Sequence, residues 1–138
     1  MEMLGLQYQE AQTWIEIARS RRVQAKFDES REAAVKAIEL AQTHGHALLE
    51  VLGRNDLANA LFAQSNVKDA EQAYRDSLRV AERAGLRLPK TMTETGLARL
   101  LIRQQRSGEA TPFLDQAEPF LRGALTGMSI DRTDREEC

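Results

Sequence analysis

The 138-residue sequence has little of what stabilises secreted miniproteins, metal sites or membrane spans. Its only cysteine, Cys138, is the last residue, so the chain cannot form an intrachain disulfide or a cysteine zinc site. Prolines number three, and aromatic residues make up only 5% of the chain. No apolar run is longer than four residues (Ala60–Ala63), whereas a membrane-spanning helix needs roughly 20. These absences exclude a disulfide scaffold and predict no membrane-spanning segment.

The sequence also lacks an excess of charge of either sign. The chain has 19 lysines and arginines against 21 aspartates and glutamates, a formal net charge of −2. A chain without a basic excess is not expected to bind nucleic acid through its overall field. The N-terminal residues lack the positive segment and apolar core of a signal peptide, so we expect a cytoplasmic protein. The length suits one domain.

Groups for catalysis are sparse. The two histidines, His44 and His46, flank Gly45, and no third histidine or internal cysteine is present to complete a metal site. We expect both histidines to be exposed loop residues. Glycine-rich phosphate loops, nucleophile elbows and metalloprotease motifs are missing as well. The sequence therefore predicts a protein that is not an enzyme and that binds no metal or cofactor.

The sequence is rich in helical periodicity. Apolar and small residues recur at spacings of three and four, and no sustained alternation favours strands. Because the connections are short, we predict six helices in three antiparallel hairpins. Pro89 should lie at the start of the fifth helix, and Pro119 should kink or end the sixth. The periodic segments are roughly 6–24, 27–41, 46–64, 70–81, 90–105 and 110–121.

The helical pattern repeats with a period of 40 residues. When the chain is offset against itself by 40, Ala18, Ala58 and Ala98 fall in one column without any insertion. This register indicates one structural unit present three times in residues 1–125, about 6–45, 46–85 and 86–125, before a polar tail at 126–138. Other matching columns are Ile17/Leu57/Leu97, Gln24/Gln64/Gln104, Ser30/Ala70/Ala110 and Ala37/Ser77/Ala117.

These units resemble the tetratricopeptide repeat (TPR), over about residues 6–125. Alanine replaces the usual glycine of the motif, Arg21 stands where tyrosine is usual, and the period of 40 exceeds the usual value of about 34. The longer period is similar to that of helical signalling and transcription-regulator solenoids. The matching residues are Trp14, Ile17, Ala18, Phe27, Ser30, Ala34 and Ala37, then Leu57, Ala58, Ala70, Tyr74, Ser77 and Leu78, then Leu97, Ala98, Ala110, Leu114 and Ala117.

The resemblance implies an all-α fold in which three stacked antiparallel helix hairpins form a short right-handed solenoid. It also implies that the first helix of each hairpin lines a concave groove, which holds a peptide or helix of a partner protein. The positions on that side of the three first helices contain four arginines, two asparagines and no carboxylate. These fifteen positions are Gln12, Ile15, Arg19, Arg22, Val23, Leu52, Asn55, Asn59, Phe62, Ala63, Met92, Thr95, Arg99, Ile102 and Arg103. Arginine presents a forked pair of donors that matches a carboxylate, so the expected partner is acidic. The candidate groove residues are Gln12, Ile15, Arg19, Arg22, Asn55, Asn59, Phe62, Met92, Arg99, Ile102 and Arg103.

Several alternatives stay open at this point. Glu16 lies three residues before Arg19, and pairing between them would reduce the positive character of the groove. The repeats would alternatively form a regulatory or sensor segment of a larger multidomain regulator. The last helix has no visible capping helix, so its residues Phe113, Phe120 and Leu121 are candidates for self-association as a homodimer. RNA binding through the arginines is a less favoured alternative.

Overall fold

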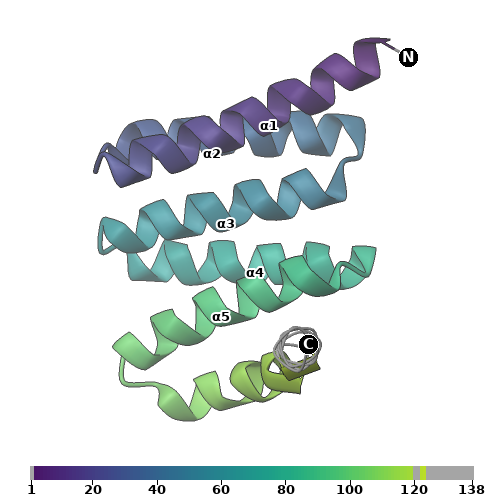
Figure 1. Ribbon diagram of the computed structural model, residues 1–138. Coiled ribbons are helices and arrows are strands. Elements are labelled where there is room, and N and C mark those ends of the chain that lie inside the picture. Colours follow the sequence, from purple (N-terminus) through teal and green to yellow (C-terminus); the bar gives the residue numbers. More distant parts are fainter. Residues whose placement is uncertain (1, 120–121, 124–138) are drawn as a thin grey trace, which may run out of the picture.

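The computed structural model describes residues 2–119 and 122–123, and within these residues every regular element is a helix (Figure 1). This confirms the predicted all-α fold of packed helices. After α5 a sixth helical segment covers residues 107–119, and residues 122 and 123 are also helical. The preceding helices are α1 (Glu2–Val23), α2 (Phe27–His44), α3 (Ala47–Ala63), α4 (Val67–Ala84) and α5 (Arg87–Arg103).

The turns between the helices are tight because one residue in each adopts a left-handed backbone conformation. Between α2 and α3 this residue is Gly45, with a φ of 70°. The Gly45 N–H donates to the Gln42 carbonyl at 3.4 Å, and the next N–H donates to the Ala41 carbonyl at 2.8 Å. These bonds satisfy carbonyls that the end of α2 would leave free. Gly85 ends α4 in the same way, with a φ of 68°.

The helices stack in chain order, as Figure 1 shows. The first helices of the three hairpins contact one another in sequence, because α3 packs against both α1 and α5. The second helices α2 and α4 each pack against α3, but they are not packed against each other. The first helices thus form one continuous side of the stack, whereas α2 and α4 are separated from each other.

The repeated small residues lie where helices approach most closely. Ala18, Ala58 and Ala98 are all fully buried. Ser30, also fully buried, donates its hydroxyl to the Ala18 carbonyl at 2.7 Å and so ties α2 to α1. At Gly96 an added Cβ would lie 2.7 Å from a ring carbon of Tyr74, so a glycine is needed there. Close helix packing therefore explains the alanine column and the small residues Ser30 and Gly96.

The helix ends test the predictions for Pro89 and for the two histidines. Pro89 lies in the first turn of α5, as predicted. The histidines are not exposed loop residues, which corrects that prediction. His44 is the last residue of α2, and His46 is half-buried with its ring edge-on to Tyr8 at 5.1 Å between ring centroids. The tail at 126–138, with Cys138, lies outside the described residues.

Candidate functional site

Seven of the predicted groove residues form one partly exposed surface on α1, α3 and α5. The contacts between these residues and their neighbours, given below, bring the three helices together at this surface. Gln12 and Met92 are exposed too, but they lie earlier in α1 and α5. We call the surface the first-helix face, and its members are Arg19, Arg22, Asn59, Phe62, Arg99, Ile102 and Arg103.

Two predicted groove residues do not belong to this surface, and this corrects the prediction for them. Ile15 is 3% exposed and packs in a core cluster with Ala11, Ala41 and Leu49. Its position on α1 faces the seam between α2 and α3, so its apolar side chain is used in packing. Asn55 is 7% exposed and bonds to hydroxyl groups of α4 and α5. Neither side chain is available to a partner.

A buried carboxylate lies beneath the first-helix face. The Asp56 side chain is 4% exposed, and its two oxygens accept hydrogen bonds from Arg19 Nε at 3.3 and 3.4 Å. Burial raises the pKa of Asp56 to about 6, although the charge and hydrogen bond of Arg19 and the charge of Arg22 oppose the rise. Arg19 is therefore held by Asp56 of the next repeat and not by Glu16, the pairing that the sequence left open.

Asn59 lies at the centre of the face and is oriented by a tyrosine from α4. The hydroxyl of the buried Tyr74 donates to Asn59 Oδ1. Burial raises the pKa of Tyr74, against the opposing charges of Arg99 and Arg22, so the phenol is a neutral donor. With its oxygen engaged, Asn59 has its amide N–H groups left to donate to another molecule.

The remaining residues of the face combine unpaired donors with apolar surface. Arg22 is half-buried, and its Nε has no hydrogen-bond partner among the described residues. A buried donor without a partner costs about 1–3 kcal/mol, so an acceptor placed there would gain this energy. The Arg103 guanidinium lies over the Phe62 ring, 5.2 Å from its centroid. Ile102, next to Arg103 on α5, is 49% exposed.

The residues predicted for self-association divide into two groups. Phe113 is half-buried and packs against the core cluster of α3, α4 and α5, with the Arg75 guanidinium 5.9 Å from its ring centroid. It is therefore largely used within the chain. Phe120 and Leu121 lie outside the described residues.

The described residues offer no cluster of three or more histidine, cysteine, aspartate or glutamate side chains able to hold a metal ion. Within the same part of the chain, no helix combines the length and the apolar character that crossing a bilayer requires.

Comparison with known proteins identifies the fold. No family model and no curated protein matches this sequence. Among solved structures, the crystal structure of the TPR domain of Arabidopsis FLU is similar, with a TM-score of 0.74. The two chains are 18% identical over 85% of this chain and 98% of that one. This chain has the TPR fold.

In this TPR fold the first helices pack side by side, which explains why Arg19 reaches Asp56. The two residues are 37 positions apart, three short of the repeat period, so Asp56 lies one helical turn before the position equivalent to Arg19. That spacing was a usable signal for the pair. Tyr74 was identified from the sequence as a residue that matches the repeat motif, and no sequence pattern shows that its hydroxyl bonds to Asn59.

Proposed function

We propose that this TPR domain is a protein-interaction module without catalytic activity, whose first-helix face binds an acidic segment of a partner protein. The observation that carries the proposal is that four arginines share the first-helix face while the carboxylate bonded to one of them, Asp56, is buried. Among the described residues Asp56 accepts hydrogen bonds only from Arg19, and it also attracts Arg22 by its charge. One carboxylate cannot offset four arginines, so the face keeps a positive excess. The four arginines are Arg19, Arg22, Arg99 and Arg103.

Each part of the face has a distinct role in this proposal. Arg22 and Arg99 lie on either side of Asn59 in the stack, on α1 and α5, and both act on the Tyr74 phenol through their charges. They would bind carboxylates of the partner, while the Asn59 amide would bind its backbone. Phe62 and Ile102 offer apolar surface for an anchoring side chain. The mixture suits an extended peptide with acidic and apolar residues, since each group on the face has a matching one on the partner.

The test uses a fluorescein-labelled peptide of alternating glutamate and leucine, with binding followed by fluorescence anisotropy at low salt. The variant carries Arg99→Glu and Arg103→Glu. The control is Arg83→Glu together with Arg79→Glu, two exposed α4 positions outside the face, which changes the net charge equally. We expect the first variant to bind roughly tenfold more weakly and the control to bind like wild type. Equal losses in both variants, or no binding to wild type, would contradict the proposal.

A further inference from the structure

A second surface lies between the second helices α2 and α4. These helices are not packed against each other, and α3 packs against both. One stripe of α3, at spacings of three and four, lines two hollows in this gap with volumes of about 840 and 490 Å³. The two hollows thus follow a single course along α3, which we call the α2–α4 groove. The stripe consists of Ala47, Glu50, Arg54, Leu57 and Leu61.

The larger hollow has an apolar floor and an acidic rim. Its floor is formed by Leu57 and Leu61, and Val35 of α2, which is 39% exposed, lies at its side. Carboxylates of α2 and α4 surround this apolar surface. They are Asp28, Glu32, Glu39 and Asp69.

Most of these carboxylates are free, whereas the neighbouring cations are engaged. Glu32, Glu39 and Asp69 form no side-chain ion pair or hydrogen bond within the described residues, and Asp28 accepts a hydrogen bond from Gln64 at 2.8 Å. Of the two basic residues of the hollow, Arg31 forms an ion pair with Asp28 at 3.9 Å, and both residues have further contacts. Arg31 donates to Gln64 Oε1 at 3.1 Å, and Lys36 Nζ lies 4.3 Å from the centroid of the Trp14 ring. With four carboxylates against two cations, the hollow has a net negative charge.

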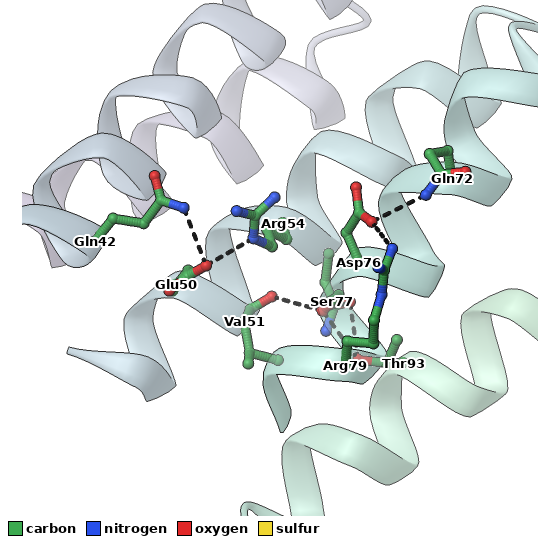
Figure 2. A network of polar contacts seen from close by, with 10 residues as sticks. Gln42, Glu50, Val51, Arg54, Gln72, Asp76, Ser77, Arg79 and Thr93 are labelled. Atoms are coloured by element: carbon green, nitrogen blue, oxygen red, sulfur yellow. Dashed lines mark hydrogen bonds and ion pairs between the residues drawn. The ribbon is translucent and has the colours of Figure 1, made fainter. Parts of the chain in front are cut away.

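The carboxylates of the smaller hollow are paired within the chain. Figure 2 shows Arg54 bonded to Glu50, at 2.9 Å, and Arg79 bonded to Asp76. Gln42 of α2 donates to the same Glu50 carboxylate at 3.4 Å. Arg83 also lines this hollow and forms no ion pair within the described residues, so the smaller hollow is left slightly positive. The unpaired negative charge of the groove therefore lies in the larger hollow.

We propose that the α2–α4 groove binds a basic amphipathic helix of a partner protein. Apolar side chains of that helix would cover Leu57, Leu61 and Val35, and its lysines or arginines would meet Glu32, Glu39 and Asp69. Glu32 and Glu39 are seven residues apart on one side of α2, so they match basic residues two turns apart on the docked helix. This partner has the opposite charge to the one proposed for the first-helix face, and the two surfaces share no residue.

The experiment measures anisotropy of a fluorescein-labelled 18-residue helix built from leucine and lysine, beside an equivalent peptide with every lysine replaced by glutamate. The groove variant carries Glu32→Lys and Glu39→Lys. The matched control carries Glu16→Lys and Asp115→Lys, exposed carboxylates outside the groove. We expect the lysine peptide to bind wild type and the control alike, and to bind the groove variant roughly tenfold more weakly. Circular dichroism checks that all variants stay helical.

Val35→Asp separates docking from simple charge attraction. This change adds negative charge but removes apolar surface, so a docked helix would bind less tightly and a merely attracted one would bind as well or better. Undiminished binding by Val35→Asp, equal loss in the control, equal binding of the glutamate peptide, or no binding to wild type would each overturn the proposal. So would sedimentation showing a dimer that the groove variant abolishes, since the groove would then hold a second copy of the chain.

The two proposals can fail separately. Arg99→Glu with Arg103→Glu should leave lysine-peptide binding unchanged, and the groove variant should leave binding of the acidic peptide to the first-helix face intact. Loss of only one kind of binding would therefore identify which surface was assigned wrongly.

Discussion

Protonation of Asp56 changes the charge of the first-helix face. Its carboxyl lies under Arg19 in the contact between α1 and α3, nearly out of solvent. Because burial raises its pKa to about 6, the group changes charge between acidic and neutral pH. Once Asp56 is protonated, Arg19 loses its charged partner and the face becomes more positive.

The effect of Asp56 on stability has a definite sign. The pKa is 3.8 in the unfolded chain and about 6 in the folded one, so the folded state retains the proton between these values. Its contribution is fully present below pH 3.8 and is lost as the pH rises through 6. From pH 4 to pH 7 the free energy of unfolding of wild type should fall by about 2 kcal/mol relative to Asp56→Asn. Urea unfolding at both pH values measures this, and a constant difference would contradict it.

Gly96 shows how little space separates α4 from α5. A Cβ at this position would overlap the Tyr74 ring, which is buried and held at Asn59. We expect Gly96→Ala to lower the free energy of unfolding by about 2 kcal/mol. Gly108→Ala is the control, because a Cβ there meets no atom within 4 Å. The control should be neutral or stabilising in urea unfolding, since alanine favours helix more than glycine does.

At the scale of the helices, the turns between hairpins and the turns within hairpins place different residues in the left-handed conformation. Between hairpins the left-handed residue is Gly45 or Gly85, whereas within hairpins it is Ala25, Ser65 or Gln105, with φ between 60° and 63°. A side chain in this conformation is strained, because its Cβ approaches the following carbonyl. The turns within the hairpins therefore carry strain that the turns between them avoid.

Exchanging the residues between the two turns should change stability in opposite directions. Ala25→Gly should raise the free energy of unfolding by about 0.5–1 kcal/mol, because the relief of strain exceeds the entropy that glycine adds to the unfolded chain. Gly45→Ala should lower it by about 1 kcal/mol for the same reason. Thermal unfolding of the two variants provides the measurement, and shifts of equal sign would show that another effect dominates.

The helices and their pairing could be predicted because both depend on the spacing of apolar and small residues, which recurs along each helix. The alanine column of Ala18, Ala58 and Ala98 gave the register, and burial of all three agrees with it. The partners of polar side chains could not be predicted in the same way. Each depends on one distance between helices, as for Tyr74 with Asn59 or Arg19 with Asp56. The burial of Ile15 was not predicted, because helical spacing alone does not show which positions of α1 the neighbouring helices cover.

For the whole molecule, Asn55 connects the second and third repeats. Its Oδ1 accepts hydrogen bonds from Ser77 of α4 at 2.8 Å and Thr93 of α5 at 3.0 Å. Ser77 and Thr93 also lie 3.3 Å apart through their hydroxyls, in the network of Figure 2. This buried polar contact joins three helices, so it couples the opening of one repeat to the next.

Asn55→Ala should weaken that coupling. The Ser77 and Thr93 hydroxyls would lose one acceptor and keep the Val51 and Pro89 carbonyls, so we expect the free energy of unfolding to fall by about 1 kcal/mol. In hydrogen exchange, amides of α5 should lose more protection than those of α1 and α2, since the damage lies at one junction. Gln72→Ala is the control, because Gln72 is exposed and bonds only to Asp76 within α4. A uniform loss of protection would show that the whole stack opens as one unit.

The separation of α2 from α4 means that the helices are in contact along one side of the stack and not along the other. The first helices are in continuous contact from α1 to α5, so we expect any bending of the stack to pivot on the line of these helices. Flexing about this line changes the distance between α2 and α4 without breaking a contact between first helices. A helix wedged into the α2–α4 groove would fix that angle, and with it the spacing of the arginines on α1 and α5. Occupancy of one side would in this way be transmitted mechanically to the other.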